Sequence, residues 1–280
     1  MLQMNIYPHI KGDRPICIVQ GNITILQEGF MMKIYFFNFS RVRRYLFLLP
    51  ALLVMAALFT GMLLSDIPAV SSKTKPYAIF KVKTDKKVAA LTFDISWGTK
   101  VPGPVLDTLK KNNVKSTFFL SGPWVKKYPE FPRRIVAEGH EIASHGNRHI
   151  DLDRESPAVV KDEITAAHQS IMEVTGVEPR LIRTPNGAWD DMVLGVADEL
   201  GYKVIQWSDD SLDWKKPGVD AIVNRVLDRV HPGAIILMHA SDTCLQTPEA
   251  LPRVLEGLKA RGYELVTVSE LLNEGTGVAE

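Results

Sequence analysis

Two histidines four residues apart, His145 and His149, follow the short apolar segment at 141–144. Side chains at this spacing lie close together on a helical turn or in a tight loop, so both imidazoles could bind one ion. Neutral imidazole is a common ligand of zinc and of other divalent metals. The pair therefore predicts a metal site at the end of that segment.

Two further groups suited to proton transfer, Asp94 and His239, also follow apolar segments. Asp94 ends the segment 88–94 and could act as a general base, with Arg183 as the cation that keeps it ionised; a purely structural pair is the alternative. His239 follows five apolar residues, and its imidazole could either donate a proton to a leaving group or bond to a loop carbonyl. Tryptophans near these segments predict stacking surfaces for sugar rings or, equally, core packing: Trp97, Trp207 and Trp214.

Apolar and amphipathic segments alternate along residues 88–268, which predicts the elements that position these side chains. β-Branched and aromatic residues favour strands in the short apolar segments. The longer amphipathic segments have start and stop signals of helices, such as Ser156 before Pro157 and Gly176 at the end. The predicted strands are 88–94, 116–121, 141–144, 180–183, 203–207, 234–239 and 264–268, and the predicted helices include 103–113, 156–176, 190–201 and 247–262.

This alternation predicts an α/β fold with parallel strands and helical crossovers. About seven such units in roughly 200 residues favour a (β/α) barrel, complete or incomplete, and an open doubly wound sheet is the alternative. In a parallel fold the carboxyl ends of the strands meet at one edge, where catalytic groups collect. The polar residues after five strands should therefore form one site: Asp94, SHGNRH, RTPNG, DDSLDW and MHAS.

Composition and charge exclude several classes of protein. The chain has 33 Lys+Arg and 32 Asp+Glu, and a net charge of +1 gives no general attraction for nucleic acid. Its two cysteines, Cys17 and Cys244, provide neither a disulfide framework nor a cysteine-based metal site. We therefore expect a globular domain without a nucleic-acid partner.

The segment 45–64 has no charged residue and, at about 20 residues, is long enough to cross a bilayer as a helix. A buried core helix is the alternative. The basic motif RVRR at 41–44 precedes the segment and Asp66 follows it, which predicts a cytoplasmic N-terminus and an external C-terminal part. We expect a single-pass protein of the cell membrane, or a secreted protein if the segment is cleaved.

The remaining chain divides around this segment. Residues 1–44 are the predicted cytoplasmic segment, and Met31 offers a second start, which would make residues 1–30 an extension. Residues 65–85 form a predicted linker, because they include the polar stretch SSKTKP. The alternating α/β domain is predicted at 86–272, followed by a tail at 273–280.

The motifs TFD, SHGNRH, RTPNG, DSLDW and LMH occur in this order, and in them the chain resembles the NodB-type polysaccharide deacetylases of carbohydrate esterase family four. The resemblance covers residues 86–272. The membrane segment together with TFDISWG is similar to the sporulation-associated branch of that family. The resemblance implies a distorted (β/α) barrel that removes acetyl groups from N-acetylated sugars of chitin or peptidoglycan, using a divalent metal ion, usually zinc.

The resemblance also implies a role for each residue that matches the motifs. Asp94 matches the catalytic base, and Arg183 matches the residue that holds this base. His145 and His149 match the two metal-binding histidines. His239 matches the general acid.

The substrate-binding residues follow from the same motifs. The backbone around Asn186 matches the turn that stabilises the oxyanion, and Asp210 matches the partner of the catalytic histidine. Trp214 matches the wall of the substrate groove, and Trp97 near the same edge is a further surface for a sugar ring.

The chain departs from the family pattern at three positions. Ile95 stands where the family has a second aspartate that binds the metal, Gly146 replaces a serine or threonine, and Asn186 replaces a tyrosine. Ile95 cannot bind a metal. Two hypotheses follow: a membrane-anchored deacetylase of peptidoglycan-type glycan with a weakly held metal, or a catalytically silent barrel that binds such glycan in the spore envelope.

Overall fold

The computed structural model describes residues 16–19, 22–27, 30–31, 54–55 and 75–279. The chain divides into two compact units, residues 1–72 and 73–280. In the first unit, β1 (Ile16–Val19), β2 (Asn22–Gln27) and β3 (Phe30–Met31) form an antiparallel sheet. No helix among the described residues is long and apolar enough to cross a membrane. The predicted span at 45–64 lies outside the described residues, apart from Val54 and Met55.

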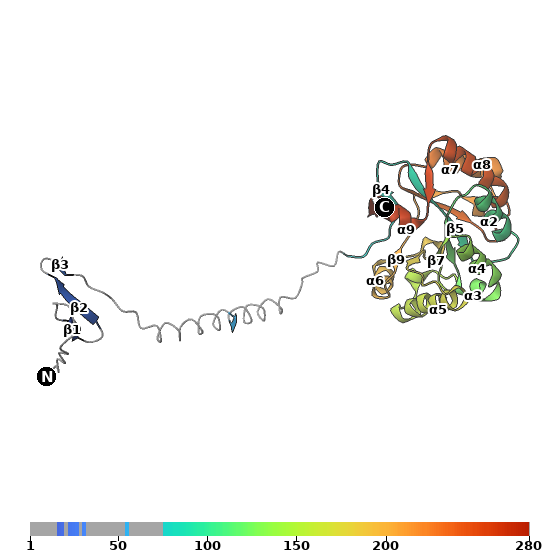
Figure 1. The fold of residues 1–280 in the computed structure, drawn as a ribbon. Helices are drawn as coiled ribbons and strands as arrows, with labels where there is room; N and C mark the ends of the chain where they lie inside the picture. The colour runs from blue at the N-terminus through green and yellow to red at the C-terminus, as the bar shows by residue number, and fades with distance from the viewer. Residues whose placement is uncertain (1–15, 20–21, 28–29, 32–53, 56–74, 280) are drawn as a thin grey trace. The chain divides into compact units, whose positions relative to one another are not determined.

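A curled sheet of mostly parallel strands forms the centre of the second unit (Figure 1). Its strands are β4 (Lys81–Lys83), β5 (Val88–Ile95), β6 (Thr117–Leu120), β7 (Glu141–Ser144), β8 (Leu181–Ile182), β9 (Lys203–Val204), β10 (Asp209–Asp210), β11 (Ala234–His239), β12 (Glu264–Val266) and β13 (Thr276–Val278). The order is β13-β4-β11-β5-β6-β7-β8-β9, with β10 paired to β11 and β12 paired to β5. Only the pairs that involve β4 are antiparallel within this sheet. This curled half-barrel confirms the predicted α/β class and the incomplete barrel.

The segment before β4 lies between the two ends of the curled half-barrel, the β9 side and the β11 side, and forms hydrogen bonds that join them. Ile79 forms an isolated parallel bridge with Ile205, which follows β9. The Ile79 N–H donates to the Val204 carbonyl at 2.9 Å, and the Gln206 N–H donates to the Ile79 carbonyl at 2.7 Å. Because β4 pairs with β11, residues 79–83 connect the two sides. We call this junction of residues 79–83 with residues 204–210 the seam.

Helices follow most of the parallel strands and cover the outside of the sheet (Figure 1). They are α2 (Pro102–Lys111), α3 (Gly122–Lys127), α4 (Glu130–Ala137), α5 (Pro157–Thr175), α6 (Asp191–Glu199), α7 (Val219–Arg229), α8 (Thr247–Ala260) and α9 (Val268–Asn273), with 3-10 turns η1 (Leu152–Arg154), η2 (Pro185–Gly187) and η3 (Asp213–Lys215). The predicted signals of α5 are present. The Ser156 hydroxyl accepts the Val159 N–H, and Gly176 ends the helix with a φ of 71°, a left-handed conformation that favours glycine.

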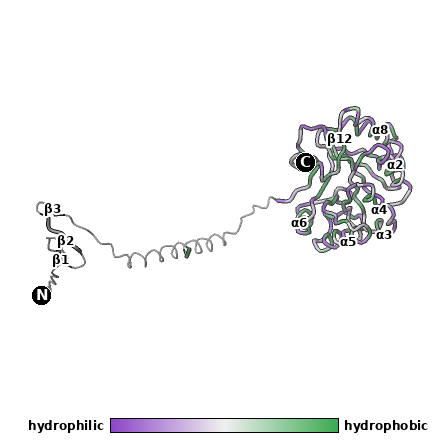
Figure 2. The backbone as a smooth tube through the Cα atoms, viewed as in Figure 1, coloured by the Kyte–Doolittle hydropathy of each residue, from purple (hydrophilic) through white to green (hydrophobic). Residues whose placement is uncertain are grey.

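The central strand β5 is buried along its whole length, as its apolar sequence predicted. Its odd-numbered residues from 89 to 95 pack in the larger apolar cluster with α2, α7 and α8, whereas Val88 and Ala90 pack in a smaller cluster inside the half-barrel. Successive side chains of a strand point to opposite faces. Asp94 therefore lies on the inner side and Ile95 on the helix side. Figure 2 shows hydrophilic stretches mainly along the periphery of this unit.

All seven predicted strands occur, most of them shorter than predicted. β7 and β11 have the predicted bounds, but the predicted strand at 203–207 contributes only two residues to β9. The structure adds α3, α4, α7 and α9 to the four predicted helices. It also adds β4, β10 and β13, each of which has two or three residues and is too short to show a period-two pattern.

Candidate active site

The carboxyl ends of β5, β7, β8 and β11 bring the predicted site residues to one pocket of about 390 Å³. The parallel register places Asp94 opposite His239, and the N–H groups of His145 and Arg183 continue the hydrogen bonding beyond β7 and β8. Arg183 is fully buried beneath the pocket. The other predicted residues all line it: Asp94, Trp97, His145, His149, Asn186, Asp210, Trp214 and His239.

A buried ion pair between Asp94 and Arg183 lies at the base of the pocket. Arg183 Nη1 donates to Asp94 Oδ1 at 2.8 Å and to the Thr92 hydroxyl at 2.9 Å, while Nη2 donates to the Gln206 carbonyl at 3.0 Å. The guanidinium also lies 4.1 Å from the ring centroid of Phe119. Burial raises the pKa of Asp94, but the charge and hydrogen bond of Arg183, together with His145 and His239, hold that pKa below its usual value. Asp94 is therefore ionised at neutral pH, as a general base requires.

His145 directs a lone pair toward Asp94. Its Nδ1 donates to the Arg183 carbonyl at 2.8 Å, so Nε2 carries no proton in the neutral ring. Burial lowers the pKa of His145 to about 4, which keeps the ring neutral. Nε2 lies 3.7 Å from Asp94 Oδ2. Two lone-pair atoms this close, with no proton between them, fit a bound cation.

His149 lies beside His145 at the same end of the pocket. The two ring centroids are 5.1 Å apart, and the His149 ring also packs at 4.7 Å against Trp97. Burial lowers the pKa of His149 as well, so both rings are in the neutral form that binds metals. The two histidines fit a divalent ion, which when bound would polarise a carbonyl group and lower the pKa of a water molecule.

His239 is paired with Asp213 and not with Asp210, so the predicted partner was wrong. The His239 Nδ1 donates to Asp213 Oδ1 at 2.7 Å, and Asp213 Oδ2 accepts the His239 N–H and the Thr247 hydroxyl. Burial lowers the pKa of His239, but the Asp213 carboxylate, with smaller contributions from Asp94 and Asp210, raises it above its usual value. Asp210 instead accepts the Leu212 N–H and lines the pocket. The left-handed turn at Leu212, with φ of 55°, separates the two carboxylates.

Cys244 lies beside this pair, and possible metal-ligating atoms of Asp213, His239 and Cys244 are within 4.8 Å of one another. Asp213 already accepts three hydrogen bonds, from His239 and Thr247. Burial raises the pKa of the Cys244 thiol to about 12, so the thiolate that metals prefer is absent at neutral pH. This cluster is therefore better suited to holding His239 than to binding an ion.

Aromatic side chains and a tight turn form the walls of the pocket. Trp97 and Trp214 are 50% and 48% exposed, so each has ring surface available for a sugar, and neither belongs to the core. Asn186 has φ of 58° within η2, and its side-chain amide donates to Asp151 Oδ1 at 2.7 Å. This contact fixes the turn that carries the Asn186 backbone at the pocket wall.

Ile95 contributes no surface to the pocket. Its side chain is fully buried in the larger apolar cluster, on the opposite face of β5 from Asp94. A carboxylate at position 95 would reach His145 only if the end of β5 turned. The pocket therefore offers His145, His149 and Asp94, whereas catalytic zinc sites usually have three ligands in addition to any base.

Three residues that hold the site were not assigned from the sequence: Thr92, Gln206 and Asp213. Thr92 lies two positions before Asp94 on the same face of β5, so its period-two position was an available signal. Gln206 acts through its backbone carbonyl, which leaves no sequence signal. Asp213 belongs to the same DSLDW motif as Asp210, and only the turn between them decides which one reaches His239.

We expect Arg183→Met to lower the free energy of unfolding by about 3–5 kcal/mol, because it leaves the Asp94 carboxylate buried without its cation. Adding Asp94→Asn should recover part of this loss, since the remaining buried group is then neutral. Urea unfolding of both single variants and the double variant measures this coupling. Arg180→Met is the control: it removes an exposed pair with Glu178 and should cost less than about 1 kcal/mol. A loss that is the same with and without Asp94→Asn would contradict the buried pair.

Comparison with known proteins places these features in a family. A family model for polysaccharide deacetylases matches residues 81–205. The chain is 36% identical over 199 residues to a peptidoglycan-N-acetylglucosamine deacetylase of Bacillus cereus, covering 70% of this chain and 93% of that protein. It is 33% identical over 200 residues to the uncharacterised protein YlxY of Bacillus subtilis, covering 71% of this chain and 62% of YlxY. The chain thus spans less than two thirds of the length of YlxY.

A solved structure with the same fold belongs to a CE4 family pseudoenzyme from Bacillus anthracis. It matches this chain with a TM-score of 0.69 at 34% identity, covering 72% of this chain and 71% of the other. A mutant of that pseudoenzyme, described as having restored enzymatic activity, matches with a TM-score of 0.69 at 35% identity, covering 72% of this chain and 74% of the other. The half-barrel, the ordered motifs and the identity to the Bacillus cereus enzyme agree, and the chain belongs to the polysaccharide deacetylase family.

Proposed function

We propose that this chain is a metal-assisted deacetylase that hydrolyses N-acetyl groups of peptidoglycan-type amino sugars. The observation that carries the proposal is an ionised carboxylate and an imidazole of raised pKa in one pocket. Arg183 holds the pKa of Asp94 low, and Asp213 holds the pKa of His239 high. Groups whose surroundings push their pKa values apart in this way can act as base and acid at the same pH.

The side chains divide the reaction between them. Asp94 accepts the proton of the attacking water, and the His239 Nε2, opposite the nitrogen bonded to Asp213, donates a proton to the departing amine nitrogen. The turn at Asn186 lines the same pocket, and its backbone would stabilise the negative charge that develops on the acetyl oxygen. Trp97 and Trp214 offer ring surfaces that would orient the sugar. His145 and His149 would hold the divalent ion, for which zinc is the first candidate.

The proposal includes a location outside the cytoplasm. Residues 45–64 carry no charge over a length that suits a membrane helix, and RVRR precedes them at 41–44. An anchor there would hold the half-barrel at the external surface, where cell-wall glycan is found. The likeness of TFDISWG to the sporulation-associated branch supports a role in spore formation.

Ile95 supports a second candidate, a catalytically silent barrel that binds the same glycan. A buried isoleucine replaces the carboxylate ligand, and a pseudoenzyme shares the fold at 34% identity. The two candidates agree on the pocket and on its ligand. They differ in whether His145 and His149 hold enough metal for turnover.

Acetate release distinguishes the two candidates. We expect the full chain with added zinc to release acetate from N-acetylated peptidoglycan fragments, and both Asp94→Asn and His239→Gln to lower the rate by about 10²–10⁴-fold. His168→Gln, on α5 and hydrogen-bonded to Tyr202, is the control and should retain activity. Wild-type protein that binds the fragments but releases no acetate would favour the silent barrel.

The pH profile tests the assignment of Asp213. The general acid must be protonated, so kcat/KM falls as pH rises through the pKa of His239. Asp213→Asn removes the carboxylate that contributes most to raising this pKa while burial remains, so the alkaline limb should move to lower pH. NMR titration of His239 gives the same pKa without requiring turnover. Asp210→Asn is the matched control, and an equal shift in this variant would contradict the assignment.

Ile95→Asp tests whether metal binding limits activity. The buried carboxylate should destabilise the metal-free variant, and zinc should recover the loss if the end of β5 turns toward His145. We expect zinc affinity to rise at least about tenfold above that of the wild type. Ile95→Asn has the same size without the charge and should be destabilised without recovery. Unchanged zinc affinity in Ile95→Asp, measured by calorimetry, would favour the silent barrel.

A further inference from the structure

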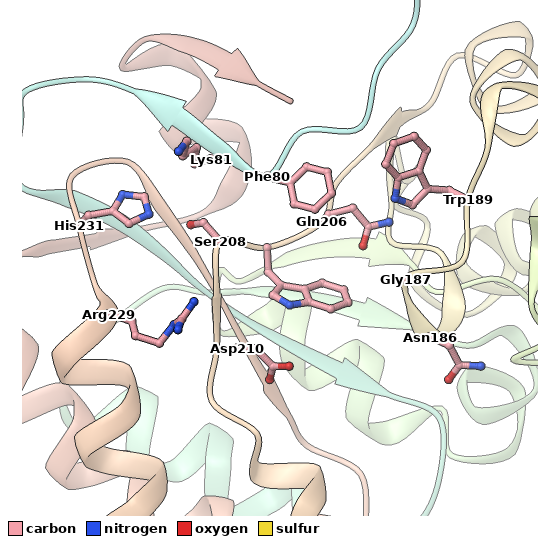
Figure 3. Close-up of a pocket in the computed structure, with 11 residues that line it drawn as sticks. Phe80, Lys81, Asn186, Gly187, Trp189, Gln206, Ser208, Asp210, Arg229 and His231 are labelled. Atoms are coloured by element: carbon pink, nitrogen blue, oxygen red, sulfur yellow. The ribbon is translucent and has the colours of Figure 1, made fainter. Parts of the chain in front are cut away.

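A second pocket of about 540 Å³ lies beside the catalytic pocket, along the seam. The two pockets share four lining residues, which are Asn186, Gly187, Trp207 and Asp210. The second pocket extends from these residues to Phe80 and Lys81 at the start of β4 and to Arg229 at the end of α7 (Figure 3). Its volume lies within the range of small-molecule sites. A ligand long enough to fill both pockets would therefore pass over Trp207.

One side of the second pocket is aromatic. Phe80 and Trp189 pack edge to face with ring centroids 6.2 Å apart (Figure 3), and Trp207 lines the same pocket. Gly187 makes room for the Trp207 indole, because a Cβ at this position would lie 2.9 Å from the ring. The guanidinium of Arg183 lies 5.6 Å from the centroid of the same indole. These rigid apolar surfaces suit the apolar face of a pyranose ring.

The other side of the second pocket is basic. Figure 3 shows Lys81, Arg229 and His231 together on the side away from Trp189 and Asn186. Lys81 is exposed and forms no ion pair within the described part of the chain. Arg229 pairs only weakly with Asp209. The distance from Arg229 Nε to Asp209 Oδ1 is 4.0 Å, which is the limit for an ion pair.

The charges of this basic side are poorly compensated. Burial raises the pKa of Asp209 to about 7, so part of its population is neutral near neutral pH. The Asp209 carboxylate accepts no hydrogen bond from any described residue. Asp210 also lines the second pocket, but it lies at the end shared with the catalytic pocket and its Oδ1 accepts the Leu212 N–H. Arg229 and Lys81 are therefore available to a ligand.

We propose that the second pocket binds a sugar that carries a carboxylate, next to the N-acetyl sugar in the catalytic pocket. The aromatic side would stack on the ring of this sugar, and the Arg229 guanidinium, with Lys81, would bind its carboxylate; guanidinium groups bind carboxylates through paired hydrogen bonds. The proposal rests on the proposed function only in taking a glycan as the ligand, and it holds whether or not the chain hydrolyses it. The site would select an acidic glycan over a neutral one of equal length.

Calorimetry on the full chain tests this selection with two probes of equal length. One is a peptide-free tetrasaccharide of alternating N-acetylglucosamine and N-acetylmuramic acid, and the other is neutral tetra-N-acetylchitotetraose. We expect the acidic probe to bind at least about tenfold more tightly, with a preference that shrinks as salt is added. Arg229→Gln should remove the preference and leave the affinity for the neutral probe unchanged. Lys81→Gln should also reduce the preference for the acidic probe, independently of Arg229→Gln.

Arg253→Gln is the matched control, because Arg253 is 50% exposed, as Arg229 is 52% exposed, and does not line the pocket. Equal affinities for both probes, or a preference that persists in Arg229→Gln, would overturn the proposal. A preference that appears only when stem peptides are attached would also overturn it, because the peptide would then supply the carboxylate. Acetate release without a preference for the acidic probe would contradict the proposed carboxylate site but not the proposed deacetylase activity. Preferential binding of the acidic probe without acetate release would contradict the deacetylase activity but not the carboxylate site.

Discussion

Arg183 carries its guanidinium into the interior of the half-barrel, where the side chain is fully buried. An unpaired buried cation would cost several kcal/mol, so its surroundings have to supply acceptors. Asp94, Thr92 and the Gln206 carbonyl do so, and they come from β5 and from the segment after β9. The requirement to satisfy one cation therefore ties the centre of the sheet to its seam, and it fixes the carboxylate that faces the catalytic pocket.

A second buried charged side chain, Asp213, also needs hydrogen-bonding partners, and it lies on the other side of the pocket. Asp213 is buried and accepts hydrogen bonds from His239 and Thr247, so this carboxylate orients the imidazole and contributes most to raising its pKa. Arg183 and Asp213 thus shift the pKa values of Asp94 and His239 in opposite directions. A pocket that merely bound a neutral sugar would not need this separation, which is why the geometry supports hydrolysis.

Ile95 is the position at which this chain is most unlike a metal hydrolase with three protein ligands. Because a strand alternates its faces, Asp94 and Ile95 lie on opposite sides of β5, and the isoleucine adds to the apolar cluster against the helices. Isoleucine at position 95 in place of an aspartate removes a metal ligand, but it leaves the acid–base pair of His239 and Asp94 undisturbed. The neighbouring pocket along the seam is not lined by Ile95, so the glycan binding proposed there does not depend on position 95.

Much of this protein follows from its sequence. The alternation of apolar and amphipathic segments predicted the parallel strands, and polar residues after five strands predicted that Asp94, His145, Arg183 and His239 meet at one edge. Local periodicity carries this information because it reports which face of an element is buried. The choice of Asp213 over Asp210 and the formation of the seam were decided by the tertiary structure. Each depends on a turn or on a contact between segments distant in the chain, and neither leaves a periodic signal in the sequence.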